Sequence, residues 1–375
     1  MVIRLGIIGL SAHPSAWATM AHIGPLSKEP LSDKYQLTAV ATSSPDSAKA
    51  AAKAFGLPED KAYSSLEAIA QDKDVDMIVV SVRVPMHHQL TMPALKAGKD
   101  AFVEWPLGAN LAQAEEMAAL AKQKGLKTAV GLQARANPVI QKAKEIIDSG
   151  ALGRVLTTNF VGTTTRFINL PEKAVYVNDP KSGADIVSIP ILHTLDALCY
   201  LLGEFKWLAA ALEKKFPEVQ FTRADGTKTD PVPSRSHDSV NIQGELESGA
   251  PVSFAYHATT RATPDHLTWV ISGEKASLKF DGDHATVQMA QTKLSLYEVP
   301  QDDAAGLYEK NVAAPWKDIE VEANMAFGGV GEVYQAFAEG DGGKGIVVDF
   351  EEAVKRHRLL DAIFRSAEKG TRETY

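Results

Sequence analysis

The sequence predicts an α/β chain with two domains: an N-terminal doubly wound parallel sheet and a C-terminal α+β domain with a large, open, mostly antiparallel sheet. In the first part of the chain, short apolar segments alternate with helical segments, which is typical of strands joined by crossover helices. In the later part, segments of alternating polarity follow one another between polar turns, which indicates antiparallel strands. We place the domains at residues 1–132 and 133–375.

The strands expected in the first domain are apolar on consecutive positions, as in a parallel sheet that is covered on both faces. These strands are residues 2–8, 35–42, 75–82, 100–105 and 127–133. The helices expected between them are residues 15–27, 45–56, 64–72, 86–98 and 110–125. Proline near the start and glycine just after the end mark the second of these helices, as Pro45 and Gly56 show.

The second domain opens with an expected helix at 138–150 and a long strand at 153–166, and a helix near 185–202 follows. The segments that then indicate antiparallel strands are "KWLAAALEKKF", "DSVNIQGELES", "PVSFAYHATT", "HLTWVISGEKASLKFDG" and "HATVQMAQTKLSLYEV". Helices at 325–340 and 349–368 are expected to close the chain.

Composition and charge exclude several classes of function. The 375 residues carry a net charge of −8 without a cluster of lysine and arginine, so nucleic acid and anionic membranes are not expected partners. No apolar run approaches the ~20 residues of a membrane span. The single cysteine, Cys199, excludes an intrachain disulfide and favours a reducing, cytoplasmic compartment, with a core position for its thiol.

The stretch "GIIGLSAHPSAWA" lies where the first strand turns into its helix. A dinucleotide-binding Rossmann turn has glycines at three positions, which are Gly9, Ser11 and Pro14 here. The helix N-terminus still offers N–H groups to a phosphate, and Ser11 adds a hydroxyl. The alternative is a structural strand–helix turn without a ligand.

The second strand ends in "AVATSSPDS", where NAD sites commonly place an acid for the ribose 2′-hydroxyl. Thr42, Ser43 and Ser44 stand there instead, so a 2′-phosphate is not repelled and can accept hydrogen bonds. This pattern favours NADP(H), with NAD also possible. Lys49 is the nearest cation, and its alternative reading is a surface lysine of the helix.

The stretches "VVSVRVPMHHQLTMPALKAG", "VEWPLG", "GLQARANPVIQKAKEIIDSGALG" and "ISGEKASLKFDGD" together resemble the Gfo/Idh/MocA family of nicotinamide-dependent sugar oxidoreductases. Within that family, "GLSAHPSAWA", "VEWPLG" and "GADIVSIPILHTLDALCYLLG" are most similar to the branch of the fungal galactose-pathway repressor. The resemblance covers nearly the whole chain.

The resemblance implies a pyrophosphate beside residues 9–12, a nicotinamide ribose beside residues 82–87, and a nicotinamide beside residues 104–105. It also implies that Gln133 and Arg135 lie where the domains join. The cofactor-binding residues predicted from the motif and the resemblance are Gly9, Leu10, Ser11, Ala12, Trp17, Thr42, Ser43, Ser44, Val82, Arg83, His87, Glu104, Trp105, Gln133 and Arg135.

The chain departs from the family at two positions. The family's lysine is Trp105, and the aspartate four residues before the active-site histidine is Ile189; that histidine matches His193, with Asp196 one turn later. An indole N–H is a donor only and cannot take a proton as a desolvated lysine can. Proton transfer from a positioned group contributes about 10²–10⁴ in rate, so the usual mechanism is impaired.

The catalytic candidates are therefore His193 as acid/base, with help from Tyr176 or Asp185. Each has a structural alternative: a core histidine, a packed aromatic residue on a loop, and the cap of a helix. Trp105 is expected to form a wall of the nicotinamide pocket or to pack in the core. No residue spacing indicates a metal site.

Two functions from different classes follow. The first is an NAD(P)-dependent oxidoreductase that acts on a sugar, a polyol or another small alcohol or carbonyl compound. The alternative is a non-enzymatic dinucleotide-binding regulator that acts through a protein partner. The open sheet of the second domain is expected to form a homodimer or tetramer.

Overall fold

The computed structural model describes residues 2–165, 170–260, 262–289, 291–298, 315–321, 329–340 and 342–375. The chain forms two compact units, each made of segments that are far apart in sequence. The first contains Met1–Ala136, Asp179–Ile189 and Met325–Arg358, and the second contains Asn137–Asn178, Pro190–Asn324 and Leu359–Tyr375. A single boundary near residue 132, as drawn from the sequence, leaves the two later segments of the first unit in the second domain.

The first unit is built on a six-stranded parallel sheet with the order β3-β2-β1-β4-β5-β6. The strands are β1 (Ile3–Ile8), β2 (Tyr35–Ala41), β3 (Ala62–Tyr63), β4 (Met77–Val80), β5 (Asp100–Val103) and β6 (Thr128–Val130). This arrangement confirms the predicted doubly wound sheet. Chain order reverses between β1 and β4, and such a switch point is where ligands bind in sheets of this kind.

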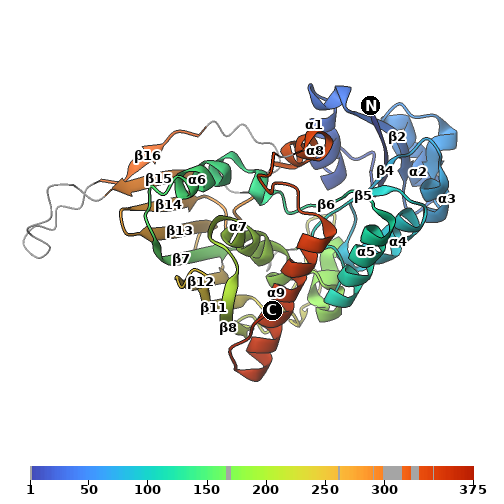
Figure 1. Cartoon of the computed structure of the whole chain (residues 1–375). Helices are drawn as coiled ribbons and strands as arrows, with labels where there is room; N and C mark the ends of the chain where they lie inside the picture. Colours follow the sequence, from blue (N-terminus) through green and yellow to red (C-terminus); the bar gives the residue numbers. More distant parts are fainter. Residues whose placement is uncertain are drawn as a thin grey trace, which may run out of the picture. The chain divides into compact units, whose positions relative to one another are not determined.

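Helices cover both faces of this sheet (Figure 1). In Figure 1, α1 and α8 lie on one side, and α4 and α5 lie on the other. The helices of this unit are α1 (Gly24–Leu26), α2 (Pro45–Ala54), α3 (Leu66–Gln71), α4 (His87–Lys96), α5 (Leu111–Lys124), α8 (Val330–Glu339) and the first part of α9 (Phe350–Lys369). The helix expected at 15–27 is shorter, because π-helical turns at Ala18–Ile23 precede α1.

Buried apolar side chains join α8 to the sheet. Tyr334 of α8 stacks on Phe102 of β5, with ring centroids 5.1 Å apart and an interplanar angle of 20°. Its ring also meets the edge of Tyr35 on β2. Burial of such large rings stabilises the unit mainly through the hydrophobic effect. The C-terminal part of the chain is thus an integral layer of the first unit; of the closing helix expected at 325–340, residues 325–328 lie outside the described residues.

The second unit is built on an eight-stranded sheet with the order β16-β15-β14-β13-β7-β12-β11-β8. Its strands are β7 (Val155–Thr164), β8 (Phe205–Glu213), β11 (Ser239–Leu246), β12 (Pro251–Ala258), β13 (His266–Gly273), β14 (Ala276–Gly282), β15 (Thr292–Glu298) and β16 (Lys317–Ile319), and a separate pair joins β9 (Glu218–Val219) to β10 (Val232–Pro233). Only the β7–β12 pairing is parallel among the described strands of the sheet. This confirms the predicted mixed, mostly antiparallel sheet.

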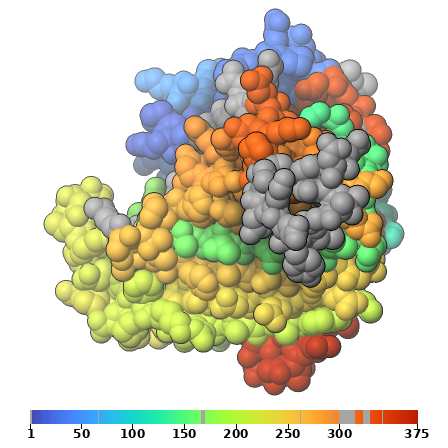
Figure 2. Space-filling model, turned by 90° about the vertical axis from the view of Figure 1, so that its left-hand side faces the viewer, coloured from blue at the N-terminus to red at the C-terminus, as the bar shows by residue number. Residues whose placement is uncertain are grey.

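One face of this sheet packs against helices. In Figure 1, α6 (Pro138–Asp148) and α7 (Leu192–Leu202) lie along the covered face. Stacked rings fill that face, including Phe160 and Phe254 at 4.6 Å and 9°. Figure 2 looks onto the other face, where β7 lies between β13 and β12. Along β7, buried and accessible side chains alternate, so neighbouring residues point to opposite faces.

The segment Pro180–Leu202 is long and apolar enough to cross a membrane, contrary to the expectation that no apolar run is of this length. Its most apolar window is, however, 83% buried within the fold. Cys199 is buried in this segment, as expected for a core residue. The segment is therefore a core helix of the protein.

Candidate dinucleotide-binding site

The turn after β1 requires glycine at its first position. Gly9 has a φ of +95°, which residues with side chains seldom adopt. A Cβ atom at this position would lie 2.3 Å from the carbonyl oxygen of Ser81 and 2.6 Å from Val82 Cγ1. The turn therefore packs directly against the chain that leaves β4, at the switch point of the sheet.

A cavity of ≈ 700 Å³ opens beside this turn. Its volume is within the ~300–1,000 Å³ of typical small-molecule sites. It is lined by Ile8, Gly9, Leu10, Ser11, Ala12, Thr42, Ser43, Ser47, Ala50, Ser64, Val82, Arg83, Met86 and Leu90. These residues follow the carboxyl ends of β1, β2, β3 and β4 or face them from α2 and α4, which is the edge where doubly wound sheets bind dinucleotides.

The cavity brings together only some of the predicted cofactor residues. Those in its lining are Gly9, Leu10, Ser11, Ala12, Thr42, Ser43, Val82 and Arg83, whereas Trp17, Ser44, His87, Glu104, Trp105, Gln133 and Arg135 are not in it. Six lining residues are not among the predicted cofactor residues, and two of them, Ser47 and Ser64, carry hydroxyl groups. Ser47 lies within the expected helix, and Ser64 follows β3, a two-residue edge strand that no periodicity could reveal.

Hydroxyl groups form the rim of the cavity near β2 and α2. Thr42 Oγ1 lies 2.6 Å from Ser47 Oγ, which also lies 2.8 Å from Ser44 Oγ. Ser44 is the N-cap of α2, and its Oγ accepts a hydrogen bond from the backbone N–H of Ser47. Ser43 is exposed between them. These hydroxyls are hydrogen-bonded to one another and to the Ser44 carbonyl oxygen, beside the positive end of α2.

The charged groups around the cavity are few. Among the described residues, the lining contains no carboxylate, and Arg83 is its single cation. Arg83 is exposed and takes part in none of the ion pairs that the described residues make. Lys49, the cation expected nearest to this rim, is paired with Glu59 at 2.5 Å and is a surface residue of α2. The cavity is therefore suited to an anionic ligand.

Glu104 follows β5, and its carboxylate accepts hydrogen bonds from two N–H groups. It does not line the cavity. Its Oε1 accepts hydrogen bonds from Trp17 Nε1 and His22 Nε2, each at 2.7 Å. When His22 donates from Nε2, its Nδ1 has a lone pair that can accept a hydrogen bond from the Tyr334 hydroxyl, 2.8 Å away. Burial raises the pKa of Tyr334 well above its usual value, so this hydroxyl keeps its proton. Neither His22 nor Tyr334 is among the residues predicted from the sequence.

Trp105 is buried, with 4% of its surface exposed. Its Nε1 donates a hydrogen bond of 2.7 Å to the backbone oxygen of Ser188, and its ring packs against His357 with centroids 4.8 Å apart. The indole thus connects the end of β5 to two segments that come much later in the chain. Its single donor is fully used by this contact.

Asp185 and Ser188 cap each other. Asp185 Oδ1 accepts a hydrogen bond from the Ser188 N–H, and Ser188 Oγ accepts one from the Asp185 N–H, both at 2.7 Å. The turns that follow, Val187–Ile191, are π-helical and contain Ile189. In this structure the Asp185 carboxylate therefore acts as a cap, which is the structural alternative given for it above.

Two histidines of the first unit, His87 and His357, are buried, and burial lowers the pKa of each ring. His87 lies between the carbonyl oxygens of Pro106 and Val82, at 2.7 and 3.0 Å, and burial lowers its pKa. A neutral ring can donate to one of these carbonyls only. Burial, together with the neighbouring His87, lowers the pKa of His357 to about 3. The Gly108 N–H faces His357 Nε2 at 3.4 Å, consistent with an unprotonated ring nitrogen.

Gln133 and Arg135 lie in a 3₁₀ turn after β6 and are buried. Arg135 Nη2 donates to Glu352 Oε1 at 3.1 Å, so this guanidinium pairs with α9 within the same unit. The predicted catalytic residues belong to different units. Asp185 is in the first unit, whereas the half-buried Tyr176 and the buried His193 are in the second.

Asp196 lies one turn after His193 on α7 and is completely buried. The second unit therefore presents the histidine and the acid on the same helix, as the resemblance implied. Over the part of the chain that the structure describes, no group of three or more His, Cys, Asp or Glu residues could hold a metal ion.

Two family models match the chain. The model of the oxidoreductase family with an NAD-binding Rossmann fold matches residues 3–132, and the model of the Gal80p C-terminal domain matches residues 138–282. A dehydrogenase, aclE of Aspergillus oryzae, is 40% identical over 374 residues, which are 100% of this chain and 98% of that protein. The chain belongs to the Gfo/Idh/MocA oxidoreductase family. Like the family, it is an NAD(P)-dependent oxidoreductase with a Rossmann domain.

The chain is also similar to a regulator of the same fold. The galactose/lactose metabolism regulatory protein GAL80 of Kluyveromyces lactis is 31% identical over 314 residues, covering 79% of this chain and 67% of that protein. A crystal structure of a super-repressor mutant of Gal80p from Saccharomyces cerevisiae matches with a TM-score of 0.86 at 25% identity, covering 100% of this chain and 98% of that one. Both halves of the expected resemblance are thus confirmed.

The low pKa of His357 predicts how stability depends on pH. In the unfolded chain this ring takes up a proton near pH 6.5, whereas in the folded chain it stays neutral down to about pH 3. Its contribution is therefore present above pH 6.5 and is lost as the pH falls, by about 1.4 kcal/mol per pH unit. When the pH is lowered from 7 to 5, the free energy of unfolding of the wild type should fall by about 2 kcal/mol more than that of His357→Phe, as measured by urea unfolding.

The matched control is His88→Gln, since His88 is a partly exposed histidine of α4 whose pair with Glu116 lies at the surface. This variant should follow the wild-type pH dependence. Equal losses in the wild type and in His357→Phe would show that the buried ring is not what titrates.

Proposed function

We propose that this protein is an NADP(H)-dependent dehydrogenase of a sugar, a polyol or another small alcohol or carbonyl compound, working in the cytoplasm with a non-standard catalytic centre. The observation that carries the cofactor choice is the rim of the cavity, which combines Thr42, Ser43 and Ser47 with Arg83 and contains no carboxylate. A ribose 2′-phosphate needs donors and a cation, whereas a ribose 2′-hydroxyl is best bound by an acid.

The remaining parts of the dinucleotide follow from the same cavity. The N–H groups of residues 10–12 and the Ser11 hydroxyl are suited to the pyrophosphate, because they follow the tight turn at Gly9. Val82 offers an apolar surface for a ribose or a ring. When bound, the dinucleotide supplies the hydride acceptor or donor of the reaction.

The proton must be handled by the chain itself. In alcohol oxidation the C–H hydride passes to the cofactor and the hydroxyl proton passes to a base, and in reduction both steps run backwards. Trp105 cannot serve, because its only donor is bound to Ser188 and an indole accepts no proton. We assign the acid/base role to His193, with help from Tyr176 or Asp185.

A second candidate function is a dinucleotide-binding regulator that controls transcription through a protein partner. It is favoured by one observation: the lysine of the usual catalytic centre is replaced by Trp105, which the fold uses as a structural contact. The similarity to the Gal80 regulators supports the same alternative. The full-length similarity to a dehydrogenase favours the enzyme.

We also propose that the face of the eight-stranded sheet that Figure 2 shows joins two copies of the chain. Register across the sheet aligns in one row Ala209, Gln243, Ser253, Asn159, Val270, Lys279 and Ser295, of which only Lys279 is charged. Val161, in the next row of β7, is 52% exposed. A mostly uncharged sheet face lets a second sheet pack against it.

The first prediction concerns cofactor choice. NADPH should bind at least tenfold more tightly than NADH, as measured by tryptophan fluorescence, which corresponds to about 1.4 kcal/mol. Ser43→Asp places the missing acid at the exposed rim and should weaken NADPH tenfold or more while NADH binding is retained. Ser32→Asp adds the same charge outside the cavity and should change neither affinity. Tighter binding of NADH by the wild type would refute the assignment.

The second prediction tests the catalytic assignment with a panel of sugars and polyols and NADP⁺. His193→Ala should lower turnover about 10²-fold or more while dinucleotide affinity and thermal stability stay near the wild-type values. A parallel loss of stability would favour a core histidine.

Trp105→Lys alone should not raise turnover, because Ile189 still replaces the second acid. A large gain would reveal a dormant standard site, and tight NADPH binding without any turnover would favour the regulator.

The third prediction concerns assembly. In sedimentation velocity the wild type should run as a dimer or tetramer, and Val161→Arg should shift it to a monomer, because an arginine cannot be buried unpaired in a flat interface. Val175→Arg is the matched control, since Val175 is 55% exposed but lies outside the sheet. A monomeric wild type, or an unchanged mass for Val161→Arg, would rule out this interface.

A further inference from the structure

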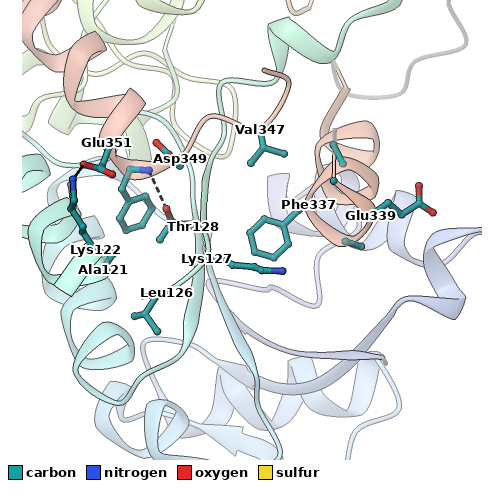
Figure 3. A pocket seen from close by; sticks show the side chains of 15 residues that line it. Ala121, Lys122, Leu126, Lys127, Thr128, Phe337, Glu339, Val347, Asp349 and Glu351 are labelled. Atoms are coloured by element: carbon teal, nitrogen blue, oxygen red, sulfur yellow. Dashed lines mark hydrogen bonds and ion pairs between the residues drawn. The ribbon is translucent and has the colours of Figure 1, made fainter. Parts of the chain in front are cut away.

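The first unit has a second cavity of ≈ 580 Å³, away from the dinucleotide site (Figure 3). It opens at the start of β6, whereas the dinucleotide cavity lies at the carboxyl ends of the strands. The ends of α5 and α8, the start of α9 and the chain before α9 enclose it. Its lining is Ala118, Ala121, Lys122, Leu126, Lys127, Thr128, Ala336, Phe337, Ala338, Glu339, Gly340, Val347, Asp349, Phe350 and Glu351.

Apolar side chains form about half of the lining, and charged or hydroxyl groups form most of the rest. Phe337 and Phe350 provide aromatic surface, and Leu126 and Val347 provide aliphatic surface. Figure 3 shows Phe337 and Val347 directed toward the same space from α8 and from the chain before α9. A volume in the range of small-molecule sites, with apolar walls and few polar groups, is the usual form of a ligand pocket.

The acidic groups of the lining are each engaged. Glu351 pairs with Lys122 at 2.7 Å, and Glu339 pairs with Lys34 at 2.6 Å, where the hydrogen bond from Lys34 lowers the pKa of that carboxyl. Asp349 Oδ1 accepts a hydrogen bond of 2.7 Å from the Glu352 N–H and so caps the start of α9. These carboxylates are therefore poor acceptors for an incoming cation.

Lys127, unlike the acidic groups of the lining, forms no such contact with its charged group among the residues that the structure describes. Its backbone N–H donates to Asp100, but over the described residues its ammonium group makes no hydrogen bond or ion pair. In Figure 3 the side chain extends beside the ring of Phe337 into the cavity. The cavity thus combines apolar side chains with an exposed lysine whose ammonium group forms no ion pair within the described ranges.

We propose that this cavity binds a small apolar monocarboxylate. The carboxylate meets the Lys127 ammonium, and the apolar body covers Phe337, Leu126 and Val347. An ion pair beside an apolar wall is screened less than one in open water, so charge and burial act together. The volume of ≈ 580 Å³ is that of a small-molecule site, which is the reason to assign a small molecule and not a peptide.

Octanoate is a suitable probe, and octanamide is its uncharged analogue. Isothermal titration is carried out on the full chain with saturating NADPH, so that the dinucleotide cavity is closed to the probe. Octanoate should bind in a saturable way, and octanamide at least tenfold more weakly. Lys127→Met keeps the stem and removes the charge, and should weaken octanoate tenfold or more, whereas Lys127→Arg should retain it.

Lys124→Met removes an equivalent charge from the exposed end of α5, outside the lining, and should leave octanoate binding unchanged. Leu126→Trp fills the cavity from a half-buried position and should abolish binding while NADPH affinity is retained. Equal binding of octanoate and octanamide, no loss in Lys127→Met, or no saturable binding at all would overturn the proposal.

Discussion

The first unit depends on the hydrogen bonds that the partly buried carboxylate of Glu104 accepts. A single oxygen accepts hydrogen bonds from Trp17, in the turn after β1, and from His22, which in turn contacts Tyr334 of α8. Charge-assisted bonds of this kind offset the cost of removing a carboxylate from water. A Cβ at Gly131 would lie 2.5 Å from Glu104 Oε2, so the neighbouring strand leaves room for the acid only because it has a glycine there.

The replacement of lysine by Trp105 can be understood from the same region. The residue after Glu104 follows β5, and members of the family have a lysine there. In this chain the indole fills space against His357 and donates to Ser188. This hydrogen bond ties Trp105 to the segment 185–189, in which Asp185 and Ser188 cap each other.

Local patterns were sufficient for much of the fold and for part of the site. Runs such as "VDMIVVSV" identify buried parallel strands, and the absence of an acid after β2 is visible in "AVATSSPDS". The contacts that decide the roles of Glu104 and Trp105 could not be seen, because their partners are distant in sequence: His22 and Tyr334 are separated by 312 positions. The alternation of polar and apolar residues also does not predict which side chains form a buried hydrogen bond. A capping role and a catalytic role for Asp185 therefore cannot be distinguished from the sequence.

The discontinuous first unit limits how this protein can be divided or recombined. A gene fragment that ends near residue 132 encodes all six strands of the parallel sheet but omits three partners of its buried polar groups: Ser188, Tyr334 and His357. Such a fragment would leave an indole N–H and a histidine nitrogen unsatisfied and the rings of Phe102 and Tyr35 uncovered. The Rossmann unit therefore cannot be moved into another protein as one continuous segment. Any chimaera that borrows it must also carry residues 179–189 and 325–358 from the same parent.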